Sequence, residues 1–191
     1  YQKSFYQRLG EKELKGLDVL AKKMAGIWKR RAGVRRSWSR RVDLAVIHWK
    51  ELEPLSEGDL DRRIRECRGG FKMSEAKLSE EALAVVCEVA ARTLKLRPYP
   101  VQMMAVVALW EGYLAEIDTG EGKTLSIALA GALAAWDGEP CHIVTANDYL
   151  AARDAKTMKR FYERLGVSVG VVIGDTEEKD RREAYRRMVT Y

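Results

Sequence analysis

One stretch of ten residues, Ala115–Thr124 (AEIDTGEGKT), constrains the fold of this chain more than any other part of it. Its two glycines, Gly120 and Gly122, let the backbone adopt conformations that a Cβ atom would forbid. Residues 112–117 predict a strand before the turn, and the apolar, alanine-rich residues 125–136 predict a helix after it. This order of elements surrounds an anion with backbone N–H groups and places the positive end of a helix behind them.

The end of this stretch matches the phosphate-binding half of a P-loop. We expect Lys123 to reach the β- and γ-phosphates of a nucleotide, and the Thr124 hydroxyl to bind the Mg²⁺ that bridges them. The full pattern, G-x-x-x-x-G-K-[ST], requires a glycine where this chain has Ile117. A glycine-rich turn that binds nothing is the alternative, but the order of strand, glycines, Lys-Thr and helix favours nucleotide binding.

Beyond residue 96, short apolar runs alternate with longer helical patterns. Such alternation is typical of βαβ units and predicts a parallel sheet flanked by helices. A nucleotide at the carboxyl end of the first strand obeys the general rule for such sheets. Because the chain stops where a strand begins, we expect it to be part of a larger α/β domain. The expected helices cover residues 101–110, 125–136, 149–165 and 177–188, and the expected strands cover 113–117, 141–145 and 167–173 and begin again at 189.

The first half of the chain contains helical patterns only. Residues 53–55 (EPL) predict a break, after which Ser56 and Ser79 are expected to cap two further helices. We therefore predict an N-terminal helical segment over residues 1–95, followed by the first part of a nucleotide-binding domain over residues 96–191. Apolar residues at helical spacing mark the first helix and are Leu9, Leu14, Leu17, Leu20, Met24 and Ile27.

Charge is distributed unevenly along the chain. Residues 1–50 hold 14 Lys/Arg and 4 Asp/Glu, a balance of +10, whereas the whole chain carries +6. Trp28, Trp38 and Trp49 lie among these basic residues. Basic residues mixed with tryptophan suit an anionic partner, either a membrane interface or a nucleic-acid backbone. The alternative is a solvated helical face whose tryptophans pack on a neighbouring domain.

Composition excludes several classes of protein. The chain is 47% hydrophobic and 32% charged, which is typical of a globular protein and not of a disordered one. No apolar run reaches the roughly 18 residues that a membrane span needs. Cys67, Cys87 and Cys141 are odd in number and far apart, and the chain has no C-x-x-C pair and no Cys/His cluster. Neither a disulfide framework nor a zinc site is therefore expected, and a reducing cytoplasmic compartment fits best.

Three stretches together resemble one family, the SecA preprotein translocase ATPases. They are residues 96–102 (LRPYPVQ), 115–125 (AEIDTGEGKTL) and 144–154 (VTANDYLAARD). SecA proteins, like the related DEAD-box helicases, lack the first P-loop glycine, which accounts for Ile117. Helicases are looser over the third stretch, so that stretch is the most specific to SecA. Asp118 departs from the family pattern, and its carboxylate would repel phosphates unless it faces solvent or is paired.

The resemblance implies an ATP site in an incomplete RecA-like domain. Gln102 would hydrogen-bond the adenine, with Tyr99 and Leu96 packing against the base. Arg97 could touch the ribose or a backbone carbonyl. The ATP-binding residues that the resemblance implies are Leu96, Tyr99, Gln102, Thr119, Gly120, Glu121, Gly122, Lys123 and Thr124, with Thr124 also binding Mg²⁺.

The resemblance also implies what the full-length protein does. It would be an ATPase that couples hydrolysis to preprotein export across the cytoplasmic membrane. Its partners would be a SecYEG-type channel, preproteins and anionic phospholipid, with a homodimer as a possible assembly, at the inner face of the plasma membrane. SecA proteins carry their Walker B carboxylates further along the chain. We therefore expect these 191 residues alone not to hydrolyse ATP.

Two alternatives stay open at this point. A superfamily 2 nucleic-acid helicase would have the same RecA-like core, and the basic, tryptophan-containing residues 1–50 are consistent with that interpretation. Residues 147–154 favour SecA over a helicase, so nucleic acid is not the expected partner. A degenerate nucleotide-binding scaffold is the other alternative, and it is motivated by Asp118.

Overall fold

The structure is a computed structural model that describes residues 32–70, 78–138 and 140–191. The chain divides into two compact units, residues 1–37 and residues 38–191, and the second unit is the subject here. The apolar stripe predicted between Leu9 and Ile27 lies outside the described residues. Helix α3 (Ala32–Leu52) covers the end of the predicted basic helix, and the break predicted after it is present.

Two serine caps organise the next helices. Helix α4 (Glu57–Gly70) begins where the Ser56 hydroxyl accepts a hydrogen bond of 3.2 Å from the Asp59 N–H. Helix α5 (Glu80–Leu94) begins in the same way, with Ser79 accepting a hydrogen bond of 3.3 Å from the Ala82 N–H. Each cap satisfies a backbone donor that the first turn of a helix leaves open. Both predicted helix starts are confirmed.

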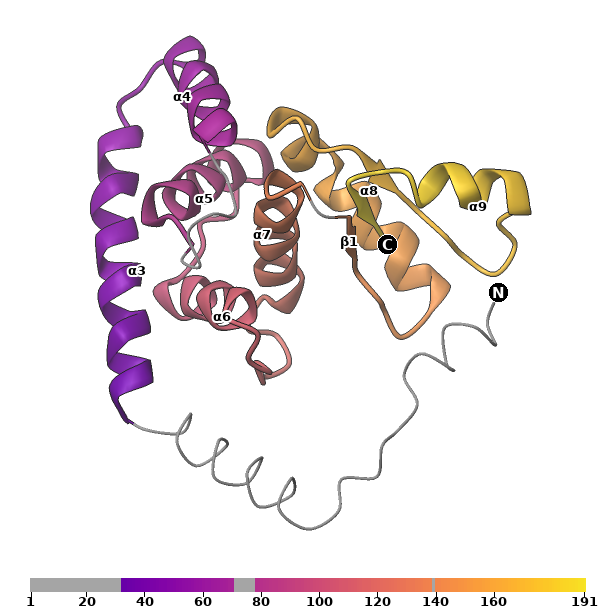
Figure 1. The fold of residues 1–191 in the computed structure, drawn as a ribbon, viewed down its shortest axis with the longest axis horizontal. Helices are drawn as coiled ribbons and strands as arrows, with labels where there is room; N and C mark the ends of the chain where they lie inside the picture. Colours follow the sequence, from indigo (N-terminus) through magenta and orange to yellow (C-terminus); the bar gives the residue numbers. More distant parts are fainter. Residues whose placement is uncertain (1–31, 71–77, 139) are drawn as a thin grey trace. The chain divides into compact units, whose positions relative to one another are not determined.

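The remaining helices also follow the predicted pattern. Helix α6 covers Pro100–Trp110, α7 covers Lys123–Trp136, α8 covers Asp148–Arg164 and α9 covers Glu178–Ala184. In Figure 1, α7 runs beside α6 and next to β1, and it packs against α5, α6 and β1. Helix α8 packs against α5 and β2. Helix α9 ends four residues earlier than predicted, because a turn over residues 185–188 separates it from the last strand.

The sheet is parallel, as predicted, but its strands are short. Strands β1 (Cys141–His142), β2 (Val169–Gly170) and β3 (Val189–Thr190) form one sheet in the order β1-β3-β2. Cys141 and Val169 both pair with Val189. Gly170 is required here, since a Cβ atom would lie 2.5 Å from the Ala184 carbonyl oxygen of α9.

The strand predicted over residues 113–117 is wrong for this structure. These residues, here called the approach segment, are irregular. Their side chains do alternate between half-buried and exposed, as in a strand, and Leu114 is 98% exposed. A strand needs a hydrogen-bonded neighbour. Within the described part of the chain, the sheet contains only β1, β2 and β3, and none of them pairs with the approach segment.

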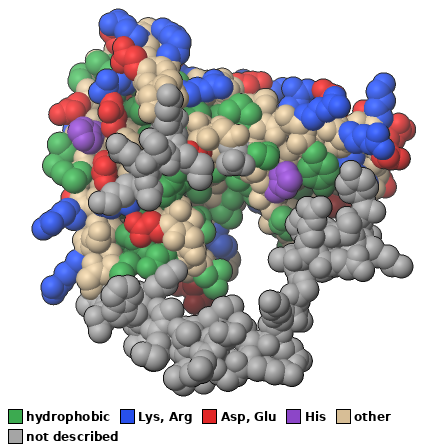
Figure 2. Space-filling view, viewed as in Figure 1, with side chains coloured by type: hydrophobic (Ala, Val, Ile, Leu, Met, Phe, Trp, Pro, Cys, Tyr) green, Lys and Arg blue, Asp and Glu red, His purple; other side chains and the backbone are tan. Residues whose placement is uncertain are grey.

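One apolar core joins the helices to the sheet. Helix α5 lies at its centre, because nine consecutive residues, Ala82–Ala90, are at most 4% exposed. Leu129 and Leu133 of α7, together with Phe161 and Tyr162 of α8, extend this core to the sheet. On the face shown in Figure 2, Lys and Arg side chains are spread over several elements, with Asp and Glu among them. Among the described helices, none is both long enough and apolar enough to cross a bilayer.

Candidate nucleotide-binding site

The glycine loop, residues 118–122, joins the approach segment to helix α7. Gly120 has φ +91° and Gly122 has φ +78°, so both occupy the left-handed region that favours glycine. Gly122 is the N-cap of α7, and the free N–H groups of the first turn follow it. The loop therefore ends at the positive pole of a helix of 14 residues, a position suited to a phosphate group.

Lys123 folds back over this loop. Its Nζ donates hydrogen bonds of 3.0 Å to the Ile117 carbonyl oxygen and 2.9 Å to the Asp118 carbonyl oxygen. The side chain is exposed, so an anion can reach the ammonium group without displacing any core residue. Two carbonyl groups hold a cation at the mouth of the loop in this arrangement.

Gln102 connects helix α6 to the glycine loop. Its Nε2 donates a hydrogen bond of 2.8 Å to the Glu121 carbonyl oxygen, and its Oε1 accepts one of 2.9 Å from the Tyr99 N–H. The side chain is 8% exposed. A Cβ atom on Gly122 would lie 2.1 Å from Gln102 Nε2, so glycine is required for this close approach. The structure thus places a residue of the predicted adenine segment directly against the predicted phosphate loop.

The other predicted site residues surround these contacts. Thr119, Gly120 and Glu121 are exposed, and Thr124 is half-buried in the first turn of α7. Asp118 is exposed, so water weakens the repulsion between its carboxylate and a phosphate group. No group of three or more metal-ligating side chains exists among the described residues. The assignment of Thr124 to a nucleotide-bound Mg²⁺ stays a prediction from the motif.

The proline segment, residues 96–100, leads into α6. Leu96 is 45% exposed and Tyr99 is 69% exposed, so both apolar surfaces are available to a ligand. Arg97 faces elsewhere. Its guanidinium carbon lies 4.4 Å from the centre of the Trp49 ring, and the group forms an ion pair with Glu53. These contacts with α3 were not predicted, because the sequence analysis assigned Arg97 to a ribose or a backbone carbonyl.

A groove of about 430 Å³ runs beside the glycine loop. Its wall includes Trp38 of α3, Gln102 of α6 and Ile117, Asp118 and Glu121 of the loop region. Trp38 was considered in the sequence analysis only as a contact to an anionic partner or as a packed residue. The structure confirms packing for both described tryptophans of that region, since Trp38 is half-buried and Trp49 is 4% exposed. Trp28 lies outside the described residues.

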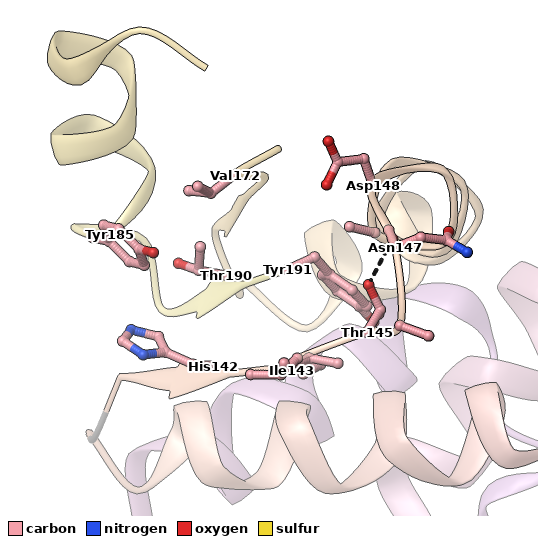
Figure 3. Close-up of a pocket in the computed structure, with 12 residues that line it drawn as sticks. His142, Ile143, Thr145, Asn147, Asp148, Val172, Tyr185, Thr190 and Tyr191 are labelled. Atoms are coloured by element: carbon pink, nitrogen blue, oxygen red, sulfur yellow. Dashed lines mark hydrogen bonds between the residues drawn. The ribbon is translucent and has the colours of Figure 1, made fainter. Parts of the chain in front are cut away.

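A second cavity, of about 340 Å³, lies where β1 and β3 end. Figure 3 shows Thr145 and Asn147 beyond β1, facing Tyr191, with His142 and Tyr185 on the opposite side. Asn147 caps α8, accepting a hydrogen bond of 2.9 Å from the Leu150 N–H. Asp148 accepts one of 2.7 Å from the Gly174 N–H, and Arg153 pairs with Asp154 on the surface of α8. This cavity contains the start of the third family-like stretch and none of the predicted nucleotide contacts.

Comparisons with known proteins match this chain to one family. The family described as the SecA DEAD-like domain matches residues 22–191. Protein translocase subunit SecA of Alcanivorax borkumensis is 41% identical over 152 residues, which cover 78% of this chain and 17% of that protein. SecA 2 of Magnetococcus marinus is 36% identical over 179 residues, or 92% of this chain and 28% of that protein. SecA of Legionella pneumophila is 41% identical over 181 residues, which cover 92% of this chain and 20% of that protein. The chain thus spans less than a third of the length of these relatives.

Proposed function

This chain belongs to the SecA family, and from that premise we propose that it forms the ATP-binding part of a SecA-type protein translocation motor. The observation that carries the proposal is the Gln102 side chain, which bonds to Tyr99 on one side and to Glu121 of the glycine loop on the other. Because of this bridge, groups suited to a base and groups suited to phosphates belong to one continuous surface. That is the arrangement a nucleoside triphosphate requires.

We assign the roles within this site as follows. Lys123 exchanges its two carbonyl contacts for the β- and γ-phosphates, and the N–H groups at the start of α7 complete the phosphate contacts. Thr124 binds the Mg²⁺ that accompanies ATP. Tyr99 and Leu96 cover the adenine, and Gln102 presents its amide to the base edge. The proposed nucleotide domain begins at residue 96, in a RecA-like arrangement, and the helical segment before it supports that domain.

The function of the whole protein follows from the family and extends our proposal. We propose that the motor couples ATP hydrolysis to preprotein export through a SecYEG-type channel. The proposed location is the cytoplasmic face of the membrane. Basic residues before α3 would then contact anionic phospholipid, because each Lys or Arg near such a surface contributes about 1 kcal/mol.

Calorimetric titration with Mg-ADP tests the nucleotide proposal directly. Lys123→Ala should weaken binding by several kcal/mol, about a hundredfold or more, because a charge-assisted contact to phosphate is lost from a sheltered loop. Lys156→Ala is the matched control, since Lys156 is an exposed lysine on α8, outside the glycine loop. Its binding should equal that of the unchanged chain. Equal affinity in the two variants would contradict the assignment of Lys123.

A further inference from the structure

Helix α3 contacts the surroundings of the proposed nucleotide site at two points, and both contacts involve tryptophan. Trp38 and Trp49 are eleven positions apart in α3, which is about three helical turns, so they lie on the same face of that helix. Each ring lines a cavity beside the site. Trp38 lines the groove that contains Gln102 and Glu121, and Trp49 lines a cavity of about 350 Å³ that contains Arg97 and Tyr99.

The first contact holds the start of the approach segment. The Trp38 ring meets the Tyr113 ring edge to face, with 4.9 Å between centroids and 84° between planes. Trp38 Nε1 donates a hydrogen bond of 2.6 Å to one oxygen of Glu111, and Arg41 donates one of 2.8 Å to the other. Both carboxylate oxygens are therefore bound by α3. These contacts fix the chain at Glu111 and Tyr113, six and four residues before Ile117, whose carbonyl Lys123 contacts.

The second contact holds the proline segment. The Arg97 guanidinium lies over the Trp49 ring of α3, and Glu53, in the turn that follows α3, pairs with the same group. Trp49 is itself fixed, because its Nε1 donates a hydrogen bond of 2.6 Å to the buried Glu88 of α5. Pro98 and Pro100 restrict the backbone between Arg97 and the start of α6.

These two contacts reach the glycine loop by two separate routes. Trp49 acts through Arg97 and the proline segment on Gln102, which bonds to the Glu121 carbonyl. Trp38 acts through Tyr113 on the approach segment, whose last carbonyl accepts from Lys123. Among the described residues, no strand pairs with residues 114–116 to hold them in place. A side-chain brace can supply the positional restraint that a sheet would otherwise give.

We propose that Trp38 and Trp49 are positioning residues of the nucleotide site, and that α3 braces the glycine loop through both of them. This inference rests on the proposed function only for its effect on nucleotide affinity. The bracing itself concerns the nucleotide-free chain and can be measured without any ligand.

Hydrogen exchange and Mg-ADP titration on the full chain together test the brace. Trp49→Leu should speed amide exchange over residues 96–102 about threefold to tenfold, and Trp38→Leu should do the same over residues 113–122. Each should weaken Mg-ADP binding by a similar factor. Trp49→Phe keeps a ring face for Arg97 and should restore slow exchange. Trp136→Phe is the control, because it removes a buried hydrogen bond of 3.0 Å to the Leu165 carbonyl. It should lower stability and leave both segments unchanged.

The possible results separate the brace from the nucleotide site. Faster exchange in the Trp→Leu variants, in a chain that does not bind Mg-ADP, would support the brace and contradict the proposed function. Unchanged exchange and unchanged affinity, in a chain that does bind Mg-ADP, would overturn the brace and leave the function standing. If exchange in the Trp→Leu variants rises over the whole chain, and not selectively over residues 96–102 and 113–122, the tryptophans are structural only and the brace is also overturned.

Discussion

Helix α5 and the approach segment are both apolar in sequence, yet they occupy opposite environments. Residues 82–90 of α5 are buried on every side, whereas Leu114 in the approach segment is 98% exposed. A helix satisfies its backbone hydrogen bonds internally, so apolar neighbours can surround it completely. An extended segment has no such internal bonds and depends on a second strand. Similar side chains therefore contribute stability in one region and not in the other.

The comparison separates stability from binding. Apolar contacts stabilise the core around α5, so substitutions in that core should change the free energy of unfolding. The glycine loop is held by a few polar contacts, from Lys123 and Gln102, to backbone carbonyl oxygens. Substitutions there should change affinity for nucleotide and affect folding much less.

The same substitution placed in each region gives the sharpest test. Leu83→Ala removes a side chain that is 1% exposed in α5 and should cost about 2 to 5 kcal/mol of stability, through lost transfer energy and the cavity left behind. Leu114→Ala removes an exposed side chain and should change stability by less than about 0.5 kcal/mol. Urea denaturation of both variants is the measurement. Comparable losses would break the comparison, since the approach segment would then be packed in solution.

A pair of glycine substitutions should give the next largest effect, on binding. Gly122→Ala places a Cβ atom 2.1 Å from Gln102 Nε2 and should displace that amide from the Glu121 carbonyl. Gly120→Ala meets no atom within 4 Å and carries only the backbone strain of a positive φ. We expect Mg-ADP to bind about tenfold more weakly to Gly122→Ala than to Gly120→Ala. Calorimetric titration of both variants with Mg-ADP is the measurement. If binding weakens equally in both, backbone strain and not the Gln102 contact sets the conformation of the loop.

Alkaline titration should give the smallest effect and examines the edge of the core at α4. Burial, with the Glu81 carboxylate nearby, raises the pKa of the Cys67 thiol from 9.0 to about 12. Because the pKa of this thiol is higher in the folded than in the unfolded state, its contribution to stability is complete below pH 9. That contribution is lost as the pH rises toward about 12. Between pH 8 and pH 10.5, the free energy of unfolding of the unchanged chain should therefore fall as the unfolded thiol ionises. Over the same range, the free energy of unfolding of Cys67→Ala should fall by about 1 to 2 kcal/mol less. Urea denaturation at both pH values would show this, and parallel losses would mean that water reaches the thiol.

Local interactions explain what could be predicted. The caps at Ser56, Ser79 and Asn147 each involve residues three positions apart, and all three are present. The periodic apolar residues of α4 to α8 and the alternation of strands with helices are local signals of the same kind. The parallel sheet followed from them, because short strands separated by helices have few other arrangements.

Contacts between distant residues explain what could not be predicted. Nothing in the sequence near Arg97 indicates that it will stack on Trp49, 48 positions earlier, and the sequence near Trp38 does not indicate Tyr113. The approach segment carried the pattern of a strand, but a strand also requires a neighbour that local sequence cannot supply.

The amino-acid sequence by itself therefore determined the helices, their caps and the glycine loop, with Lys123 and Thr124 at the start of a helix. Backbone propensity and short-range hydrogen bonds decide those features. Only the tertiary structure decided that Gln102 bonds to that loop, that Asp118 is exposed and that α3 contacts both the proline segment and the start of the approach segment. Those features depend on which surfaces meet when the apolar core closes, and that is a property of the whole chain.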